Sequence, residues 1–192
     1  VDADDIVEEM ITTSQQHTEE LGKVKDFTAD ELTALYNTIG LGAMKFYLLR
    51  VDPKKTMVFN PAESIDFHGF TGPFVQYTYA RIKSILRKQV EATDNGQQTT
   101  DNWLLKAEKE VIVVAEQYGS IIEQAAQEHN PSVIANYVFN LAKTFNSFYS
   151  ELSVANAETE DKKQLRLKIS LLTANVLKSG MQLLGINVPE RM

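Results

Sequence analysis

The sequence predicts an all-α fold, a bundle of six or seven helices with a short irregular connector. Apolar residues recur at helical spacing over long segments, and Gly, Pro and polar runs separate these segments. No repeat of fixed period is visible, so a globular bundle is favoured over a solenoid. The 192 residues are enough to bury one main helical core.

The first two helices are expected in an acidic segment at the start of the chain. Residues 2–21 place apolar side chains near helical spacing and acidic side chains in the first turns, where they interact favourably with the helix dipole. Gly22 ends this pattern. A second helix begins at Thr28, because Glu31 three residues later completes a capping-box pattern. The pair Asp52-Pro53 stops it.

An irregular connector is expected at residues 56–72, where Pro61 and Gly69 interrupt any periodicity. Pro73 then suits the first turn of a helix, and the apolar pattern continues to Val90. The connector therefore leads directly into the next helix.

Four further helices are expected in the second half of the chain, after a polar loop at residues 94–100. Asn130 and Pro131 separate the second of them from the third. Their expected positions are 103–117 behind a cap at Asp101, 118–128, 132–152, and a long last helix that follows the polar residues 156–161 and stops at Gly185.

The charge is unevenly distributed along the chain. The formal net charge is -7, but residues 1–35 hold ten acidic and two basic residues, so the rest is nearly neutral. Residues 45–88 carry eight basic residues against three acidic ones. Because binding to a polyanion depends on neutralising phosphates, this local excess permits an RNA contact without requiring one. The alternative is a solvated surface.

Several classes of chemistry find no support in the residues. Without Cys the chain has no disulfide and no thiolate metal site. It also lacks the common glycine-rich phosphate loops, and its three His residues lie far apart outside any metal or nucleophile pattern. No catalytic residues and no metal ligands are therefore expected. The acidic start is unlike a signal peptide and no apolar run reaches membrane length, so a cytoplasmic protein is expected.

The predicted helix from Pro73 to Val90 has two distinct faces. Placed at steps of about 100°, its core stripe consists of Val75, Tyr79, Ile82, Leu86 and Val90. The almost opposite stripe consists of Phe74, Tyr77, Arg81, Ser84 and Lys88. Two aromatic rings and two cations on one face suit a stacked base beside a phosphate. Alternatively, the rings pack against a neighbouring helix and Arg81 pairs with an acid.

Residues 66–82, DFHGFTGPFVQYTYARI, closely resemble the segment that opens the anticodon-binding domain of class I arginyl-tRNA synthetases. Other segments resemble this family in the same order along nearly the whole chain. They are IGLGAMKF at 39–46, IANY at 134–137, LAKTFNSFY at 141–149 and the ending LLGINVPERM at 183–192.

The resemblance implies that this chain is the carboxy-terminal part of such an enzyme. Residues 1–60 would be the helical tail of the catalytic body and a linker, and residues 61–192 a DALR-type anticodon-binding bundle. The family's Lys-Met-Ser-Lys-type and His-Ile-Gly-His-type motifs, which embrace ATP, are absent. The chain alone is therefore expected to need no cofactor and to make no arginyl-adenylate, whereas the full-length ligase would use ATP and magnesium. Its ending is expected to be natural and its beginning a cut.

The resemblance also implies a partner and a pocket. The expected partner is arginine tRNA, bound by a monomer without DNA or membrane contact. All arginine anticodons have C in the middle, and the family role of reading this base falls on Phe74, Tyr77, Arg81 and Met192. Lys83, Arg87 and Lys88 are further candidates for phosphate contacts. Two alternatives stay open, a helical scaffold that binds another protein and an unrecognised self-sufficient enzyme.

Overall fold

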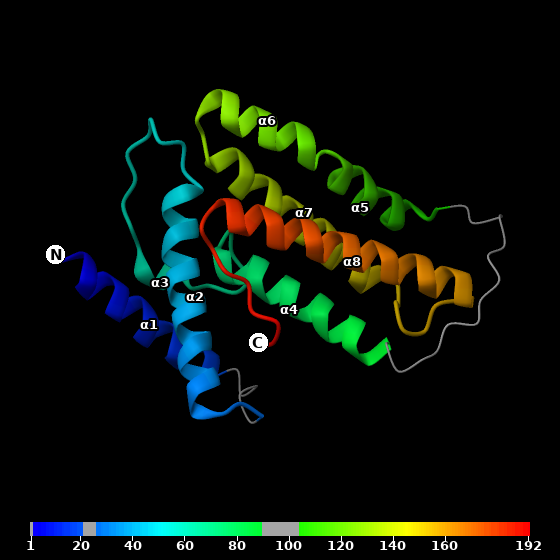
Figure 1. Ribbon diagram of the computed structural model, residues 1–192, viewed down its shortest axis with the longest axis horizontal. Helices are drawn as coiled ribbons and strands as arrows, with labels where there is room; N and C mark the ends of the chain where they lie inside the picture. The colour runs from blue at the N-terminus through cyan, green and yellow to red at the C-terminus, as the bar shows by residue number, and fades with distance from the viewer. Residues whose placement is uncertain (1, 21–25, 90–103) are drawn as a thin grey trace.

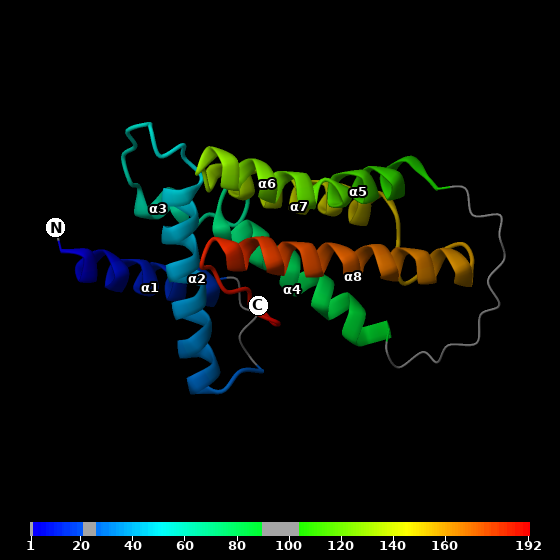
Figure 2. The same cartoon turned by 45° about the horizontal axis from the view of Figure 1, so that its top comes forward.

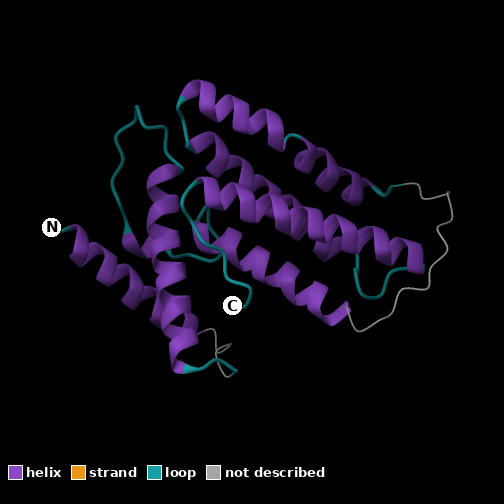
Figure 3. Ribbon diagram, viewed as in Figure 1, coloured by secondary structure: helices purple, strands orange, loops and turns teal. Residues whose placement is uncertain are grey.

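The computed structural model describes residues 2–20, 26–89 and 104–192, and helices with their connecting loops account for all of this described part (Figure 3). The helices are α1 Ala3–Glu20, α2 Ala29–Leu49, α3 Pro61–Ser64, α4 Gly72–Gln89, α5 Lys106–Glu116, α6 Tyr118–Glu128, α7 Ser132–Glu151 and α8 Glu160–Leu183. The predicted all-α fold is confirmed. Seven of these helices match predicted ones.

The helix starts follow from local hydrogen bonding. The predicted capping box before α2 is present, because the Glu31 carboxylate accepts from the Thr28 N–H at 2.8 Å and the Thr28 hydroxyl accepts from the Glu31 N–H at 3.3 Å. The short helix α3 lies inside the predicted connector, where Asn60 caps it and Pro61 occupies its first turn. Four residues are too few to show a periodicity in sequence.

The predicted start of α5 was wrong. The helix begins at Lys106, and Leu105 occupies the cap position. The Leu105 N–H donates to the Glu108 carboxylate at 2.9 Å. This is the half of a capping box in which the third helical residue accepts from the cap residue, and Leu105 makes no side-chain cap hydrogen bond of its own. Asp101 and Trp103, the predicted cap and first residue of this helix, lie outside the described residues, as do Gly22 and Val90.

The main core lies among α4, α5, α7 and α8. Figure 1 shows α7 and α8 running side by side, with α4 on one side and the α5–α6 pair on the other, and packing between these elements agrees with that arrangement. Among the described residues, the central helix α7 contributes more buried apolar residues than any other helix, in agreement with its predicted periodicity. Its buried apolar residues are Ile134, Ala135, Tyr137, Val138, Leu141, Ala142, Phe145 and Phe148.

A smaller core lies where α1 packs against α2. Met10, Leu35 and Ile39 form its centre together with Ala43 and Ile65. Helix α2 stands upright beside α1 in Figure 2. It joins the two cores, because Ala43 belongs to the smaller core and Phe46, near the end of the helix, to the main one. The division of the chain near residue 60 stays a prediction.

Residues 184–192, here called the C-terminal segment, turn back after α8 and pass beside α2 and α4 (Figure 1). The turn uses Gly185 at φ 68°, a backbone conformation that favours glycine. Lys45 of α2 donates to the Gly185 carbonyl at 2.8 Å, and Gln76 of α4 donates to the Asn187 carbonyl at 2.8 Å. The chain end is therefore fixed against two helices.

The contact between α2 and α4 requires glycine at its closest point. A Cβ added to Gly72 would lie 2.7 Å from the Gly42 carbonyl oxygen and 2.9 Å from the Phe46 Cβ. We expect Gly72→Ala to lower the free energy of unfolding by about 1–3 kcal/mol, the usual cost of overpacking, in urea titrations followed by circular dichroism. Gly119→Ala is the control, because nothing lies within 4 Å of the added methyl group. Equal stability of the two variants would contradict the close approach.

Candidate functional site

A cavity of about 730 Å³ opens between α4 and the C-terminal segment. Four parts of the chain line it: the segment before α2, one face of α4, the end of α7 with the turn that follows, and the last two residues. We call it the α4 cavity. Residues 26–27 and 191–192, which are far apart in the sequence, therefore meet at one hollow, which no local sequence pattern could indicate.

The α4 face of the cavity contains most of the predicted aromatic and cationic stripe. Tyr77, Arg81, Ser84 and Lys88 all line the cavity. They fall on one side because they are spaced three or four residues apart on a helix. The structure thus brings Tyr77, Arg81 and Lys88 of α4 together with Met192 at one cavity.

Arg81 is held by an amide and two rings instead of an acid. Its Nη1 donates to Asn146 Oδ1 at 2.6 Å. Its guanidinium carbon lies 4.8 Å from the centre of the Tyr77 ring and 5.7 Å from that of Tyr149. No carboxylate among the described residues pairs with it, so its charge faces the cavity without a neutralising partner.

Phe74 lies away from the cavity, contrary to its predicted place beside Tyr77. Its ring packs against Phe139 of α7, with centroids 5.1 Å apart, and belongs to the edge of the main core. Phe74 and Tyr77 are three residues apart, so their side chains are offset by about 60° around the helix axis. Phe74 therefore lies at the margin of the predicted stripe. Because α7 crosses the first turn of α4, it covers this margin.

The three predicted phosphate-contacting cations differ in their surroundings. Lys83 does not line the cavity and forms an ion pair with Glu190 at 3.1 Å. Arg87 lines it but donates to the Glu190 carbonyl at 3.0 Å. Lys88 lines it, is exposed, and forms no ion pair with any residue of the described ranges. Lys88 is thus the most available of the three.

The last two residues close one side of the cavity. Arg191 places its guanidinium carbon 4.3 Å from the Phe27 ring centre and donates to the Asp26 carbonyl at 3.0 Å. Met192 lines the cavity and also packs against the smaller core. Sequence reasoning missed Phe27, Tyr149 and Arg191 as cavity residues. The only signal in the sequence was an aromatic residue near the end of a predicted helix, Tyr149, which the structure leaves partly exposed.

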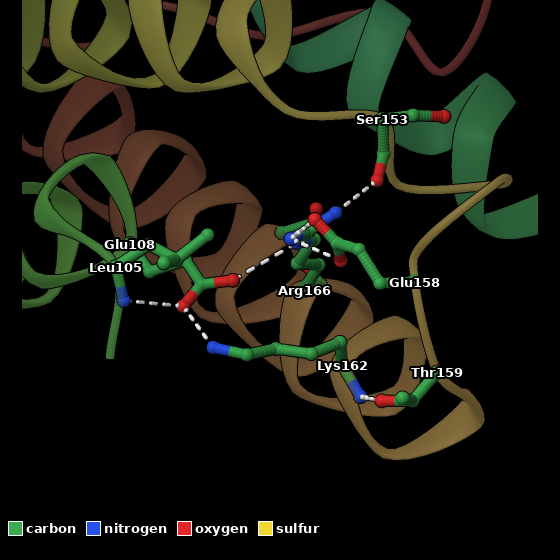
Figure 4. A network of polar contacts seen from close by, with 8 residues as sticks. Leu105, Glu108, Ser153, Glu158, Thr159, Lys162 and Arg166 are labelled. Atoms are coloured by element: carbon green, nitrogen blue, oxygen red, sulfur yellow. Dashed lines mark hydrogen bonds and ion pairs between the residues drawn. The ribbon is translucent and has the colours of Figure 1, made fainter. Parts of the chain in front are cut away.

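A buried charge network supports the wall of the cavity (Figure 4). The fully buried Glu108 carboxylate accepts from Lys162 Nζ at 2.7 Å and from Arg166 Nε at 2.9 Å. Arg166 also pairs with Glu158 at 2.7 Å and donates to the Ser153 carbonyl at 2.6 Å. Since Ser153 lines the cavity, the network fixes the turn after α7.

The network keeps its acid ionised. Burial alone would raise the pKa of Glu108, but hydrogen bonds from Lys162, the Leu105 N–H and Arg166 bring that pKa below its usual value. Burial likewise acts to lower the pKa of Arg166, and its bonds to Glu108 and Glu158 raise it instead. A buried cation and a buried anion therefore stabilise each other.

The arrangement suits binding of an unstacked base. Tyr77 and Tyr149 place aromatic rings beside the Arg81 guanidinium at the cavity, and a hollow of this size accepts a planar base with its phosphate. No group of three or more His, Asp or Glu side chains in the described part of the chain is placed to hold a metal ion. None of the described helices combines the length and apolar character of a membrane span.

Comparisons with known proteins agree with an RNA-binding cavity. The family described as DALR anticodon binding domain matches residues 75–192. The chain is 51% identical over its whole length to an arginine–tRNA ligase of Flavobacterium psychrophilum and 44% identical to one of Parabacteroides distasonis, of which it covers 31% and 32%. It thus spans about a third of the length of the curated relatives it matches.

Solved structures show the same fold. The arginyl-tRNA synthetase of Thermus thermophilus superposes with a TM-score of 0.90 at 30% identity, over the whole of this chain and 32% of that one. The arginyl-tRNA synthetase of Plasmodium falciparum superposes with a TM-score of 0.81 at 21% identity, over the whole of this chain and 34% of that one. The second likeness concerns the fold alone.

Proposed function

Since this chain belongs to the DALR anticodon binding domain family, we propose that it binds and recognises the anticodon stem-loop of an arginine tRNA. The α4 cavity carries the proposal, because it places aromatic rings and a guanidinium within the region that the family matches. That guanidinium has no ion-pair partner among the described residues. This is the chemistry that binds an unstacked RNA base.

The whole protein would be a ligase of which this chain is the carboxy-terminal part. The curated relatives are arginine–tRNA ligases about three times as long. We propose that the full-length protein attaches arginine to its tRNA as a cytoplasmic monomer, using ATP and magnesium. In this proposal the residues outside this chain bind those groups, and the chain alone does not activate arginine.

Within the cavity we assign the middle anticodon base to Tyr77, Arg81 and Met192. A cytosine would stack on the Tyr77 ring, while Arg81 reaches a phosphate or a base acceptor. Acceptor groups at the chain end would take the hydrogens of the cytosine amino group. Phe74 enters this proposal only as a support that holds the first turn of α4 against α7.

We expect the chain to bind arginine tRNA weakly, with strong dependence on salt. Its net charge is -7, and two of the three candidate phosphate contacts are engaged by Glu190. Each neutralised phosphate steepens the salt response by roughly 0.7–0.9 log units per log unit of salt. Fluorescence anisotropy with labelled tRNA, between about 50 and about 200 mM salt, measures this slope.

The same titration tests recognition when the middle anticodon base is changed. The proposed function requires that native arginine tRNA binds more tightly than the middle-base mutant. A dissociation constant that is independent of salt would contradict the predicted phosphate contacts. Equal affinity for the two tRNAs would refute recognition of the middle anticodon base by this chain and, together with salt dependence, would leave only a general RNA contact.

A further inference from the structure

Glu190 is the only acidic residue that follows Asp161 in the chain. Its carboxylate accepts from the Tyr79 hydroxyl at 2.8 Å and pairs with Lys83 at 3.1 Å, and its backbone carbonyl accepts from Arg87 at 3.0 Å. These three donors are spaced by four residues, so they form one row along successive turns of α4. One residue of the C-terminal segment thus contacts a whole row of residues on α4, and we call these three contacts the Glu190 clamp.

The contact with Tyr79 is the part of this clamp that water screens least. Tyr79 is 2% exposed, whereas Lys83 and Glu190 keep contact with solvent, and an exposed ion pair alone contributes little. Burial, followed by the hydrogen bond to Glu190, raises the pKa of Tyr79 to about 12. Burial would raise the pKa of Glu190, but its bonds to Tyr79 and Lys83 lower it. The acceptor is therefore ionised at neutral pH.

The clamp restricts where the chain end can lie. Met192 lies two residues beyond Glu190, and two residues span at most about 7 Å. Arg191 is directed to Phe27 and Asp26 on the opposite side of the cavity. Met192 is thereby kept at the cavity, because Glu190 and Arg191, the two residues before it, are both held in place.

We infer that Glu190 is a positioning residue, which sets Met192 in the α4 cavity through Tyr79 and Lys83 and so controls discrimination of the middle anticodon base. The inference rests on the proposed function of that cavity. Glu190 itself does not line the α4 cavity. It acts through the residue that follows two positions later.

The test compares Glu190→Ala with Glu123→Ala in the same 192-residue chain. Glu123 lies on α6 outside the cavity lining, so its replacement matches the change in net charge. Relative to this control, Glu190→Ala should reduce the preference for native over middle-base-mutant tRNA by about tenfold, the scale of one lost charged hydrogen bond. The release of Lys83 affects the binding of both tRNAs alike, so it does not change this ratio. Deleting Met192 in the Glu190→Ala background should add no further loss, because both changes remove the same contact.

A second readout does not use RNA. Carboxypeptidase should release Met192 slowly from the unchanged chain and from Glu123→Ala, and faster from Glu190→Ala, with circular dichroism confirming that each variant is folded. Glu190→Gln keeps an acceptor for Tyr79, so its rate of Met192 release should lie between those of the unchanged chain and Glu190→Ala. If Glu190→Ala disturbs folding, Glu190→Gln takes its place in the comparison.

The outcomes separate the inference from the proposed function. If the unchanged chain does not prefer native tRNA, the proposed function fails, and the inference about base discrimination fails with it. Two results would overturn the positioning role and leave the proposed function standing, provided that the unchanged chain prefers native tRNA. In the first, Glu190→Ala keeps the full preference. In the second, the loss of preference caused by Glu190→Ala adds to the loss caused by deleting Met192. Unaltered release of Met192 in Glu190→Ala would also overturn it.

Discussion

Glu108→Gln is expected to lower the free energy of unfolding by about 3–5 kcal/mol, the usual cost of removing one partner from a buried ion pair. The Glu108 side chain is fully buried between Lys162 and Arg166, and Arg166 is only 1% exposed (Figure 4). An amide keeps the shape but leaves both cations without their buried counter-charge. Urea unfolding at neutral pH, followed by circular dichroism, measures the difference.

Glu110→Gln is the matched control on the same helix. Glu110 pairs with Lys106 at 3.8 Å, and both side chains are exposed. Exposed pairs contribute at most about 1 kcal/mol, so this variant should differ little from the unchanged chain. If Glu108→Gln proved as stable as Glu110→Gln, the network would be a weak contact and not a support of the cavity wall.

The pH dependence gives the same prediction a second measurement. The pKa of Glu108 is lower in the folded chain than its ordinary value, so the folded state holds this carboxylate ionised more strongly than the unfolded state does. Its stabilisation is complete above the unfolded pKa and is lost as the pH falls through the folded pKa. The unchanged chain should therefore approach Glu108→Gln in stability below about pH 4. Parallel stability curves for the two proteins would contradict the assignment.

Local signals in the sequence were sufficient for most of the fold. The capping box at Thr28 and the long apolar stripe of α7 involve residues within one or two helical turns, so they can be recognised without a tertiary structure. The short α3 and the true start of α5 cannot be recognised from such signals. At Lys106 the helix start depends on Glu108, which also belongs to a network formed by residues more than fifty positions later.

The candidate site was predictable only where one helix supplies it. Tyr77, Arg81 and Lys88 follow from the periodicity of α4, and the resemblance added Met192. Phe27, Tyr149 and Arg191 reach the cavity through tertiary packing, which spacing does not reveal. Phe74 was misplaced for the same reason, because the crossing of α7 determines which edge of the α4 stripe is covered.

Tyr77→Ala is expected to reduce binding of native arginine tRNA by about 1–3 kcal/mol, the measured range for losing one stacked base. The Tyr77 ring lies beside the Arg81 guanidinium at the cavity, so its removal takes away both the stacking face and a support of the cation. Tyr77→Phe keeps the ring and should bind nearly as well. Fluorescence anisotropy with native and middle-base-mutant tRNA measures both variants.

Phe74→Leu separates the cavity from the helix that carries it. Phe74 packs against Phe139 and does not line the cavity, so a similar apolar side chain should change tRNA binding little. Tyr77→Ala should weaken binding of native tRNA more than binding of the middle-base mutant, because in the proposed pocket only the native base stacks fully on the ring. If Tyr77→Ala is folded and weakens both tRNAs equally, Tyr77 is a general RNA contact. If Phe74→Leu instead abolishes the preference for the native base, recognition lies on the first turn of α4 and the cavity is not the pocket.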